Sequence, residues 1–585
     1  MSEKPLITLG LTGTVGHDPA AALFIDGELV AAVEEERLIR RKHAKDEMPY
    51  HSARYCLQSA SINPMDVDIV AIPNAPISLL SPARWHYARR HWYAPDRALD
   101  SLFNGNRRYR RYVKQVRHLL EQLHIPWKKI KFVPVEHQLA HASSVYHLSG
   151  YQGRTAILTI DSRGEYATIL LAEGQDGRIR KLREFYDPDS LSGMYGAITD
   201  YLGFEILDGE FKVMGMAPFG DPDRYDLSFL AHFTGKNFKV DNRLISTVGF
   251  RRYKAKSRGH FFSRKLIDKL GPRREGALVD DPYVHYAASI QRYYEHVATG
   301  LVINYLYPAL KDTGQLVFAG TGSMNIKLNH RLQELPSVKH FFVHPAAGDS
   351  GSAIGAASYA VAREGVPIKP LRHVFLGPRF TKAQCISACR NHREKPQWEE
   401  LENAPRKAAE LLNQGHLVAW FQGHMEFGPR ALGNRSILGN PCQPGVADLL
   451  NSTIKFRERW RPFSPSLLDS FAPEFLEQGW EHGFMCISQE VRERWHEQFA
   501  AVVYKDGTTR PHVVTHEANP RFYQLLKTME ELTGVGMVIN VALNRPGEAL
   551  VCSPEDAVNL FEGSELEYMI MEDILVTKRE EPDSW

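Results

Sequence analysis

Before residue 365, short apolar segments alternate with turns and helix-like stretches. Of all the features of the sequence, this alternation places the strongest limit on the fold. Three such segments open the chain, at 6–11, 20–25 and 28–33. Asp26-Gly27, between the second and the third, is typical of a β-hairpin. Further segments follow at 67–72, 156–161 and 315–318. Strands that alternate with helices predict a mostly parallel α/β fold with two subdomains.

A second domain is predicted beyond this region, because 585 residues are too many for one hydrophobic core. The segment 363–367 ends a helix rich in small residues, and Pro370 precedes a strand-like run at 373–376. Proline ends helices and stiffens linkers. We therefore predict two domains, 1–365 and 366–585.

Charge and cysteine usage narrow the class of protein. The formal net charge is +2, so the field of the whole molecule favours neither nucleic acid nor an anionic membrane. The first residues lack the apolar core of a signal peptide, and no apolar run approaches the roughly 18 to 20 residues of a membrane helix. Six scattered cysteines do not form a disulfide framework, and Cys385 and Cys389 lack the second pair of a structural zinc site. We expect a cytoplasmic protein that binds neither nucleic acid nor membrane.

Two segments are interpreted as surface additions. The region 84–117 is rich in arginine and aromatic residues, a mixture that would also suit stacked bases and phosphates. Because the total charge is nearly neutral, a solvated helical insert is favoured over a nucleic-acid surface. The region 251–274 is interpreted as a mobile linker within the first domain.

A histidine pair, His137-Gln138-Leu139-Ala140-His141, indicates a metal site. Histidines four apart share one face of a helix, so both imidazoles can reach one ion. Gln138 stands where a metalloprotease carries its glutamate, which argues against a protease. Such a pair alone is more often structural, but Asp161 after a buried strand and Asp349 before a helix add two carboxylates. This donor set suits iron or manganese, with magnesium as an alternative, and leaves positions for phosphate oxygens.

Glycine-rich turns indicate a nucleotide site. Gly320-Thr321-Gly322-Ser323-Met324-Asn325 follows a strand and opens a helix-like stretch, so its backbone N–H groups can face an anion. Gly348 and Gly351 would let a triphosphate approach the backbone beside Asp349. An ordinary strand-to-helix turn is the alternative, but two such turns near four possible metal ligands favour ATP.

The predicted second domain carries a basic set. It comprises Arg430 and Arg435 within 427–436, followed by Lys455, Arg457, Arg459, Arg461 and Arg510. These cations lie beside glycine, proline and phenylalanine, which is not the pattern of a solvated helix face. Guanidinium groups bind phosphate esters with two parallel hydrogen bonds. The set predicts a site for a small phosphate ester, and ordinary surface arginines are the alternative.

These motifs resemble the nodulation-factor and cephalosporin carbamoyltransferase family, which also includes the tobramycin carbamoyltransferase-like enzymes of natural-product synthesis. The resemblance runs from end to end. It comprises Gly16-His17-Asp18, 32–37 with Arg40, Lys42 and His43, the histidine pair, 210–220, the turn ending at Asn325, Gly348-Asp349, 428–436, 454–455, 461–465 and 506–511.

The resemblance implies both a fold and a reaction. The first domain would have the actin-like ATPase fold of the tRNA threonylcarbamoyl transferases, and the second an α/β fold like that of the YrdC proteins. Carbamoyl phosphate would be cleaved to carbamate in the second domain. Carbamate would react with ATP in the first to give carbamoyl adenylate and pyrophosphate, and a hydroxyl of a small-molecule natural product would accept the carbamoyl group. The resemblance leaves open whether the protein forms a homodimer.

The resemblance also implies roles for individual residues. The metal ligands would be His137, His141, Asp161 and Asp349, and ATP would lie against Gly320, Gly322, Asn325 and Gly348. Carbamoyl phosphate would be held by Arg430, Lys455, Arg461, Arg510 and Asn540. His17 and Lys42 would be catalytic and face the adenylate and the acceptor.

Four positions depart from the family pattern. Val541 and Ala542 stand where the family commonly has threonine and serine, so two hydroxyls are lost near the predicted carbamoyl phosphate site. Thr321 replaces a common glycine of the nucleotide turn, and Ser162 follows Asp161 where glycine is usual. Because the basic residues remain, we expect weaker or rearranged binding of carbamoyl phosphate.

Other functions stay open at this point. One is an ATPase-fold binding protein without transferase activity, which the retention of all four metal-ligand candidates disfavours. Another is a carbamoyltransferase of tRNA modification or hydrogenase maturation. The domain order and the lack of acylphosphatase or zinc-finger segments disfavour the hydrogenase type. The sequence does not identify the acceptor.

Overall fold

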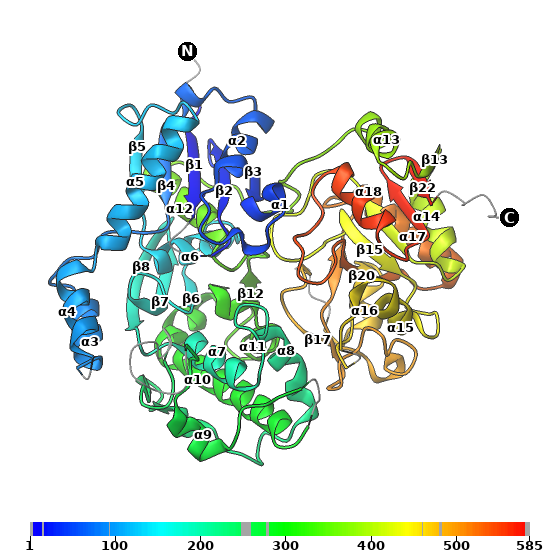
Figure 1. Ribbon diagram of the computed structural model, residues 1–585. Helices are drawn as coiled ribbons and strands as arrows, with labels where there is room; N and C mark the ends of the chain where they lie inside the picture. Colours follow the sequence, from blue (N-terminus) through cyan, green and yellow to red (C-terminus); the bar gives the residue numbers. More distant parts are fainter. Residues whose placement is uncertain are drawn as a thin grey trace. The chain divides into compact units, whose positions relative to one another are not determined.

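The chain forms two compact units. The computed structural model describes residues 4–13, 17–92, 94–246, 259–276, 280–458, 460–478 and 483–578. The first unit comprises Met1–Val30 and Asp46–Leu371, and the second comprises Ala31–Lys45 and Arg372–Trp585 (Figure 1). One predicted boundary at 365 does not describe this division, because Ala31–Lys45 belongs to the second unit. Gly16, Arg459 and 251–258 of the predicted linker lie outside the described residues.

The first unit contains two five-stranded sheets. One has the order β3-β2-β1-β4-β5 and the other the order β12-β11-β6-β7-β8. The strands of the first sheet are β1 (Ile7–Thr12), β2 (Ala20–Ile25), β3 (Glu28–Glu34), β4 (Ile69–Ile72) and β5 (Lys131–Pro134), and the last four residues of β3 are assigned to the second unit. Those of the second are β6 (Thr155–Ile160), β7 (Ala167–Gln175), β8 (Arg178–Tyr186), β11 (Gln315–Ala319) and β12 (His340–Val343). The strands predicted at the chain start are therefore confirmed.

Both sheets are mixed, so the prediction of a mostly parallel architecture is wrong. Strand β1 pairs with β2 antiparallel and with β4 parallel, and β6 pairs with β7 antiparallel and with β11 parallel. The reason is local: only a few residues of sequence separate β1 from β2 and β6 from β7, and antiparallel neighbours need no crossover helix.

Two helices pack together between these sheets. Helix α6 (His137–Tyr146) contacts β6, β7 and β11, and α12 (Gly351–Arg363) contacts β1, β2 and β4 (Figure 1). The helices approach closely because a Cβ atom on Gly355 would lie 1.8 Å from the carbonyl oxygen of Ala140. The long helix α10 (Tyr283–Thr313) packs against β6, β7 and β11. It also contacts α7 (Leu191–Tyr201), α8 (Glu210–Met216) and α11 (Ile326–Gln333).

The arginine-rich insert is helical, as predicted, but it is not fully solvated. It forms α3 (Pro82–Arg90), α4 (Pro95–Asn104) and α5 (Arg107–Gln122). Tyr87 and Tyr112 are buried, and so is Arg84, whose guanidinium donates to the carbonyls of Ile77 and Leu102. The insert is therefore packed onto the first unit. The described part of the predicted linker also contains ordered structure, namely α9 (Arg264–Leu270) and the buried Arg274. The remaining elements of this unit are α2 (Tyr50–Ser59), β9 (Ala231–Phe233) and β10 (Phe238–Val240).

The second unit is built on an eight-stranded mixed sheet with the order β13-β22-β21-β14-β15-β20-β16-β19. Its strands are β13 (Gln397–Glu400), β14 (Val418–Phe421), β15 (Arg435–Gly439), β16 (Ser464–Leu468), β19 (His512–Val514), β20 (Met537–Ala542), β21 (Tyr568–Met571) and β22 (Ile574–Thr577). A short pair, β17 (Gln489–Glu490) and β18 (Thr508–Thr509), is separate. The run predicted as a strand at 373–376 forms one isolated bridge, between Phe375 and Glu426.

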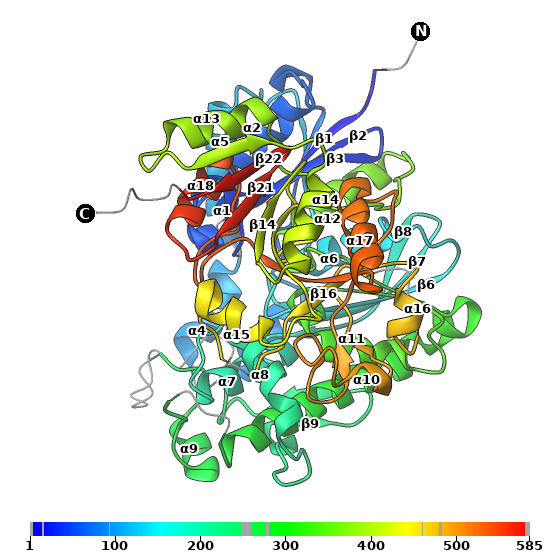
Figure 2. The ribbon, with the colours of Figure 1, turned by 90° about the vertical axis from the view of Figure 1, so that its right-hand side faces the viewer.

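Helices complete this unit. They are α1 (Glu35–Ile39), α13 (Lys382–Asn391), α14 (Ala404–Asn413), α15 (Val446–Leu450), α16 (Ala472–Phe475), α17 (Pro520–Thr533) and α18 (Pro554–Glu562). Figure 2 shows α14 and α17 side by side, and these two helices contact each other. Among the described helices of the whole chain, none has the length and apolarity needed to span a membrane.

Candidate functional site

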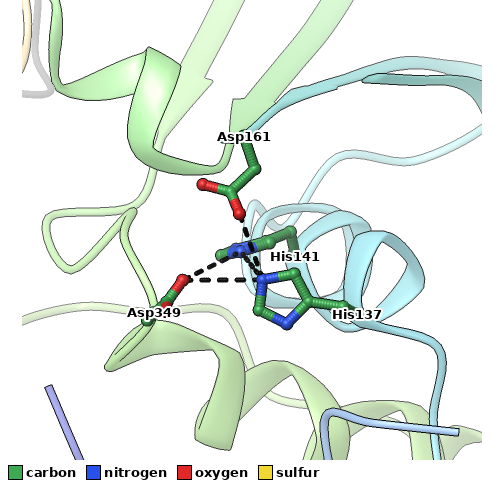
Figure 3. A group of neighbouring side chains, drawn as sticks. All are labelled: His137, His141, Asp161 and Asp349. Atoms are coloured by element: carbon green, nitrogen blue, oxygen red, sulfur yellow. Dashed lines mark hydrogen bonds and ion pairs between the residues drawn. The ribbon is translucent and has the colours of Figure 1, made fainter. Parts of the chain in front are cut away.

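Two histidines and two aspartates converge in the first unit (Figure 3). His137 and His141 lie in the first turns of α6, Asp161 directly follows β6, and Asp349 precedes α12. His137 Nε2 lies 3.1 Å from His141 Nε2, 3.2 Å from Asp161 Oδ2 and 3.5 Å from Asp349 Oδ1. All four side chains are buried. The four predicted ligands are therefore brought together.

The spacing of these atoms fits one shared cation. One donor atom from each residue lies within 4.8 Å of all the others. Ligands at about 2.1 Å from an ion are roughly 3.0 to 3.4 Å apart at octahedral or tetrahedral angles. The buried Asp349 Oδ1 makes no hydrogen bond among the described residues, so its lone pairs are available. The donor set and its spacing suit a divalent metal.

The protonation of the cluster also indicates a cation site. Burial lowers the pKa of His137, but its hydrogen bond to Asp161 and the nearby carboxylate of Asp349 outweigh the effect of burial, and the pKa lies well above its usual value. Burial and the charge of His137 lower the pKa of His141 to about 4. Although burial alone would raise the pKa of each aspartate, the histidines hold both values below normal. Two buried carboxylates require a positive charge, and without metal the proton on His137 supplies it.

Residues around the ligands hold them in place. Asp161 Oδ1 accepts hydrogen bonds from the Thr321 hydroxyl (2.5 Å) and backbone N–H (3.2 Å). Asp349 Oδ2 accepts from the backbone N–H of His17 at 3.0 Å. Glu165 Oε2 accepts from the backbone N–H of His137, the first residue of α6, at 3.2 Å. His17 is thus brought to the predicted metal site, and its ring Nδ1 lies 3.6 Å from Asp349 Oδ2.

The predicted nucleotide turn follows β11 and includes η5 (Thr321–Met324). Gly320 has a φ of 90°, and a Cβ atom there would lie 2.3 Å from the carbonyl oxygen of Ile160. A Cβ atom on Gly322 would lie 2.6 Å from the Tyr294 hydroxyl oxygen, whereas a Cβ atom on Gly348 would have room. Asn325 caps α11 through a hydrogen bond from the Leu328 N–H. The turn and Asp161 meet at Thr321, so the predicted nucleotide and metal residues are adjacent.

A pocket opens directly beside the cluster. His137 and Asp349 form part of its wall, and Asn74, Tyr112 and Arg163 are among its other lining residues. Tyr112 comes from α5 of the insert, and its hydroxyl donates to the carbonyl of Leu11 at 3.2 Å. The cluster therefore borders this pocket through His137 and Asp349.

Four arginines gather in the second unit. Burial and the charges of Arg510 and Arg461 lower the pKa of Arg430 to about 9. Burial and the charges of Arg461 and Arg510 likewise lower the pKa of Arg457 to about 9. Arg430 and Arg457 are both affected by the charges of Arg461 and Arg510, so these guanidinium groups lie near one another. The structure therefore places Arg430, Arg461 and Arg510 together with Arg457.

Asn540 belongs to the same neighbourhood. It lies opposite Ser464 in the sheet, and Ser464 Oγ accepts a hydrogen bond from Arg510 Nε at 2.9 Å. Asn540 Nδ2 donates to the carbonyl of Ala431, the residue after Arg430, at 3.2 Å. Asn540 Oδ1 is buried and makes no hydrogen bond among the described residues. A polar acceptor thus borders the four arginines.

Lys455 is engaged differently from the arginines. Its ammonium donates to the carbonyl oxygens of Ala542 (2.5 Å) and Asn544 (2.7 Å), and to Asn544 Oδ1 (3.0 Å). Burial and the charge of Arg457 lower its pKa to about 7. In this conformation Lys455 holds the end of β20 in place.

Val541 and Ala542, the two positions of β20 that depart from the family pattern, face opposite sides of the sheet. Residues two apart in a strand share a face, so Ala542 lies on the side of Asn540 and Val541 on the other. Val541 is buried in the hydrophobic core of the second unit. Only the change at Ala542 therefore removes a hydroxyl from the face that carries Asn540.

Lys42 lies in the second unit, within the segment Ala31–Lys45, whereas His17 lies in the first. The segment Ala31–Lys45 is attached to the rest of the second unit through the backbone N–H and carbonyl of Gly428. Glu34 Oε1 accepts from the Gly428 N–H at 2.7 Å, and Arg37 Nη2 donates to the Gly428 carbonyl at 2.9 Å. Arg40 Nη2 donates to the Ala549 carbonyl at 3.0 Å. The acidic and basic residues at 34–40 thus bind this segment to the second unit.

Several residues around these sites were not among the predicted ones. They are Arg163, Glu165, Thr321 as a hydrogen-bond donor to Asp161, and Ser464, whereas Arg457 belonged to the predicted basic set but not to the residues that the resemblance assigns to carbamoyl phosphate. The run Asp161-Ser162-Arg163-Gly164-Glu165 was a usable signal, because polar residues there follow a buried strand that ends in a predicted ligand. Arg457 lies in the basic set, and nothing in its spacing distinguishes it from surface arginines.

Comparison with known proteins identifies similar sequences over nearly the whole chain. A family model described as "Carbamoyltransferase N-terminus" matches residues 7–358, and one described as "Carbamoyltransferase C-terminus" matches 409–578. "Nodulation protein NolNO" of Sinorhizobium fredii is 33% identical, over 99% of this chain and 82% of its own length. "3'-hydroxymethylcephem-O-carbamoyltransferase" of Streptomyces clavuligerus is 25% identical, over 76% of this chain and 80% of its own.

Solved structures give weaker similarity. An "Activator of the 2-Hydroxyisocaproyl-CoA Dehydratase from Clostridium difficile with bound ADPNP" has a TM-score of 0.33 and 13% identity, over 62% of this chain and 97% of its own. HypF of T. kodakarensis has a TM-score of 0.31 and 12% identity, over 63% of this chain and 50% of its own.

Proposed function

The chain belongs to the carbamoyltransferase family, a family of transferases, and from this premise we propose that it is an ATP-dependent O-carbamoyltransferase. The observation that carries the proposal is the pairing of a cation-binding cluster in one unit with an anion-binding cluster in the other. Carbamoyl transfer from carbamoyl phosphate through ATP requires both kinds of site. In this proposal the first unit is actin-like and the second YrdC-like.

The first unit would activate the carbamoyl group. His137, His141, Asp161 and Asp349 would hold the metal, iron or manganese by donor type, with magnesium as the alternative. When bound, the metal supplies positive charge that polarises phosphoryl and carbamoyl oxygens. Gly348, where a Cβ atom would have room, would allow a nucleotide to approach the backbone, and Gly320 and Gly322 let the turn that would face it pack against Ile160. Asn325 would orient that turn as the cap of α11.

The second unit would cleave carbamoyl phosphate. Arg430, Arg457, Arg461 and Arg510 carry like charges, and Glu458 pairs with Arg461 at 3.4 Å; a phosphate dianion would relieve the remaining repulsion. Asn540 Oδ1 can accept a hydrogen bond from the amino group of a carbamoyl moiety. Lys455 would hold Ala542 and Asn544 in position for this contact. Carbamate and inorganic phosphate are the products expected here.

Two further steps would connect the cleavage of carbamoyl phosphate to the carbamoylated product. Carbamate would attack the α-phosphate of ATP, forming carbamoyl adenylate and releasing pyrophosphate. The acceptor hydroxyl would then attack the carbamoyl carbon, the bond to the phosphate oxygen would break, and AMP would leave. His17, beside Asp349, and Lys42 are proposed to face these groups. The acceptor would be a small hydroxylated molecule, and the cephem enzyme among the relatives supports this class.

The test is incubation of the protein with ATP, carbamoyl phosphate and Mn²⁺ or Fe²⁺, with a panel of small hydroxylated molecules and, separately, unmodified tRNA. We expect pyrophosphate release and a mass gain of one carbamoyl group on small hydroxylated molecules. Carbamoylation of tRNA with no small-molecule product would instead favour a tRNA-modifying enzyme. Nucleotide binding without pyrophosphate release under any condition would favour a binding protein.

A further inference from the structure

The segment 79–122, which contains α3, α4 and α5 of the insert, differs in charge from the rest of the chain. It carries ten arginine and lysine residues against three acidic residues, a net charge of +7. Because the whole chain carries +2, all other residues together carry −5. The expectation that the protein binds no membrane rested on the total charge, which conceals this asymmetry. The segment is a local source of positive potential, and such a source attracts anionic partners.

One side of α5 brings much of this charge to the surface. Its exposed basic residues recur three and four positions apart: Arg107, Arg110, Arg111 and Lys114. Residues with this spacing share one side of a helix. The other side, which includes Tyr112 and Val116, is buried. Within the residues that the structure describes, none of the four cations forms an ion pair, so the basic side of α5 faces solvent with its charge unpaired.

The carboxylates near the insert offset other basic residues. Asp100 on α4 accepts a hydrogen bond from Asn104 Nδ2 at 3.1 Å, and its charge acts on Arg108. Arg90 Nη2 lies 2.8 Å from Oδ1 of the buried Asp189. Glu121, the one acidic residue of α5, belongs to the end of that helix. The basic side of α5 therefore keeps its charge although carboxylates lie nearby.

The same segment exposes large apolar side chains. Six of them lie between positions 79 and 103: Leu79, Leu80, Trp85, Trp92, Leu99 and Phe103. Leu99 and Phe103 are four apart and share one side of α4, and Trp92 is 79% exposed in the turn after α3. Figure 1 shows α3 and α4 side by side at the edge of the first unit, and the two helices contact each other. This pair of helices therefore presents tryptophan, phenylalanine and leucine to its surroundings.

This combination matches the surface of an anionic bilayer better than it matches other partners. Proteins that bind at a bilayer surface insert tryptophan, phenylalanine and leucine at the level of the headgroups, while arginine and lysine attract anionic lipids. A second copy of the chain would bring two basic segments together, and like charges repel. Single-stranded nucleic acid would stack on the aromatic rings but would leave the exposed leucines without apolar contacts.

We propose that the segment 79–122 docks the protein on the surface of an anionic bilayer. The basic side of α5 would be drawn to the lipid headgroups, and the exposed apolar side chains of α3, α4 and their flanking turns would enter the boundary between headgroups and acyl chains. The docking is peripheral. It uses none of the residues proposed to hold metal, ATP or carbamoyl phosphate, so the inference does not depend on the proposed function.

The experiment measures binding of the full-length protein to lipid vesicles by flotation. The probes are vesicles of phosphatidylcholine alone and of phosphatidylcholine mixed equally with phosphatidylglycerol, each at low and at high salt. In a second measurement, phosphatidylcholine brominated on its acyl chains is included, because bromine quenches the fluorescence of tryptophans that enter the bilayer. Trp85→Phe/Trp92→Phe protein identifies which part of the quenching comes from the insert.

Two double variants test the two parts of the surface. Arg110→Gln/Arg111→Gln removes charge from α5, and Arg393→Gln/Lys395→Gln removes the same charge from exposed positions of the second unit as its control.

Leu99→Ser/Phe103→Ser removes the apolar side of α4. Its matched control is Ile303→Ser/Tyr307→Ser, because these residues are also four apart on a helix, α10, and are 49% and 50% exposed. The thermal transition of each variant is measured to show that it is folded.

We expect wild type to bind the mixed vesicles and to bind phosphatidylcholine alone roughly tenfold or more weakly. Each basic residue near an anionic surface contributes about a fivefold gain in binding, so Arg110→Gln/Arg111→Gln should bind roughly thirtyfold more weakly. Leu99→Ser/Phe103→Ser should lose roughly tenfold or more. High salt should weaken binding, since it screens the charges. Both controls should bind as wild type does, and Trp85→Phe/Trp92→Phe should lose most of the quenching.

Several results would overturn the inference, and none of them bears on the transferase assays. One is an absence of vesicle binding, or equal binding to both kinds of vesicle. Another is binding that both insert variants retain in full. A dimer that forms without vesicles and is abolished by Leu99→Ser/Phe103→Ser would assign the surface to a second copy of the chain. Binding of single-stranded RNA without binding of vesicles would assign it to nucleic acid.

Discussion

The metal cluster of the first unit and the arginine cluster of the second solve opposite electrostatic problems. In the first, histidines and aspartates of opposite charge lie within hydrogen-bonding distance, and the pKa of His137 rises as a result. In the second, guanidinium groups of like charge lie together, and the pKa values of Arg430 and Arg457 fall to about 9. A proton on His137 offsets one of the two carboxylates in the first cluster, and in the second Glu458 lies 3.4 Å from Arg461. The difference implies that the two sites respond separately to mutation and to ligands.

Removing the histidine pair should give the largest effect and the sharpest test of this separation. His137→Ala/His141→Ala protein should lose bound metal and retain less than about 1% of pyrophosphate formation, because metal-ion catalysis supplies several kcal/mol. Release of phosphate from carbamoyl phosphate should continue. Metal analysis, with separate phosphate and pyrophosphate assays, measures all three. Unchanged metal content with full activity would remove the metal from the mechanism.

Arg461→Ala should give the complementary result. Loss of one charged hydrogen-bonding group costs about 1.5 to 3 kcal/mol, so phosphate release should fall roughly ten- to a hundredfold. Binding of metal and ATP to the first unit should be unchanged. Arg393→Ala is the matched control, because the Arg393 side chain is 93% exposed and away from the cluster in sequence. The division of labour would be abandoned if this variant and the histidine variant lost the same half-reaction.

Thr321→Val tests whether the hydrogen bond to Asp161 supports the metal. Loss of such an outer-shell partner typically costs about 10- to 100-fold in metal affinity. Valine keeps the shape of threonine without its hydroxyl, and Thr321→Ser restores a hydroxyl as the control. Metal titration of the three proteins measures the effect. Equal affinities would mean that the Thr321 backbone N–H alone is sufficient to orient Asp161.

Inorganic phosphate should stabilise the second unit, since it would offset the repulsion among its arginines. Saturation to about 100 times the Kd adds about 2.7 kcal/mol. For a unit of this size that corresponds to about 5–11 °C in the midpoint of its thermal transition. Scanning calorimetry with phosphate against chloride of equal ionic strength checks this. Equal shifts from both salts would show general screening in place of a specific site.

Ala542→Ser should have the smallest effect. A neutral hydrogen bond contributes about 0.5 to 1.5 kcal/mol, so carbamoyl phosphate should bind roughly two- to tenfold more tightly. Metal binding should not change. Val541→Thr is a useful contrast, because that side chain lies in the core and its hydroxyl would face the wrong side of β20. Tighter binding in Val541→Thr but not in Ala542→Ser would contradict the assignment of faces.

Local features of the sequence were predictive, and long-range ones were not. The opening strands and the His137–His141 pair depend on residues a few positions apart, so the periodicity was sufficient. The mixed pairing of β6 depends on which strands meet across the unit, which no local pattern encodes. Thr321 lies 160 residues from Asp161 in the chain. It looked like a departure from a glycine turn, and only the fold relates it to the metal cluster.

The crossing of the segment Ala31–Lys45 affects how the molecule can be divided. The chain leaves the first unit after Val30, returns at Asp46 and leaves again after Leu371, so three peptide bonds connect the units. A protease that cuts once near 371 would therefore release neither half. A gene truncated there would yield a second unit without Glu34, Arg37 and Arg40, and the carbonyls and N–H groups they bind would lose their partners. Separate production of this unit requires residues 31–45 to be supplied as a peptide or rejoined by circular permutation.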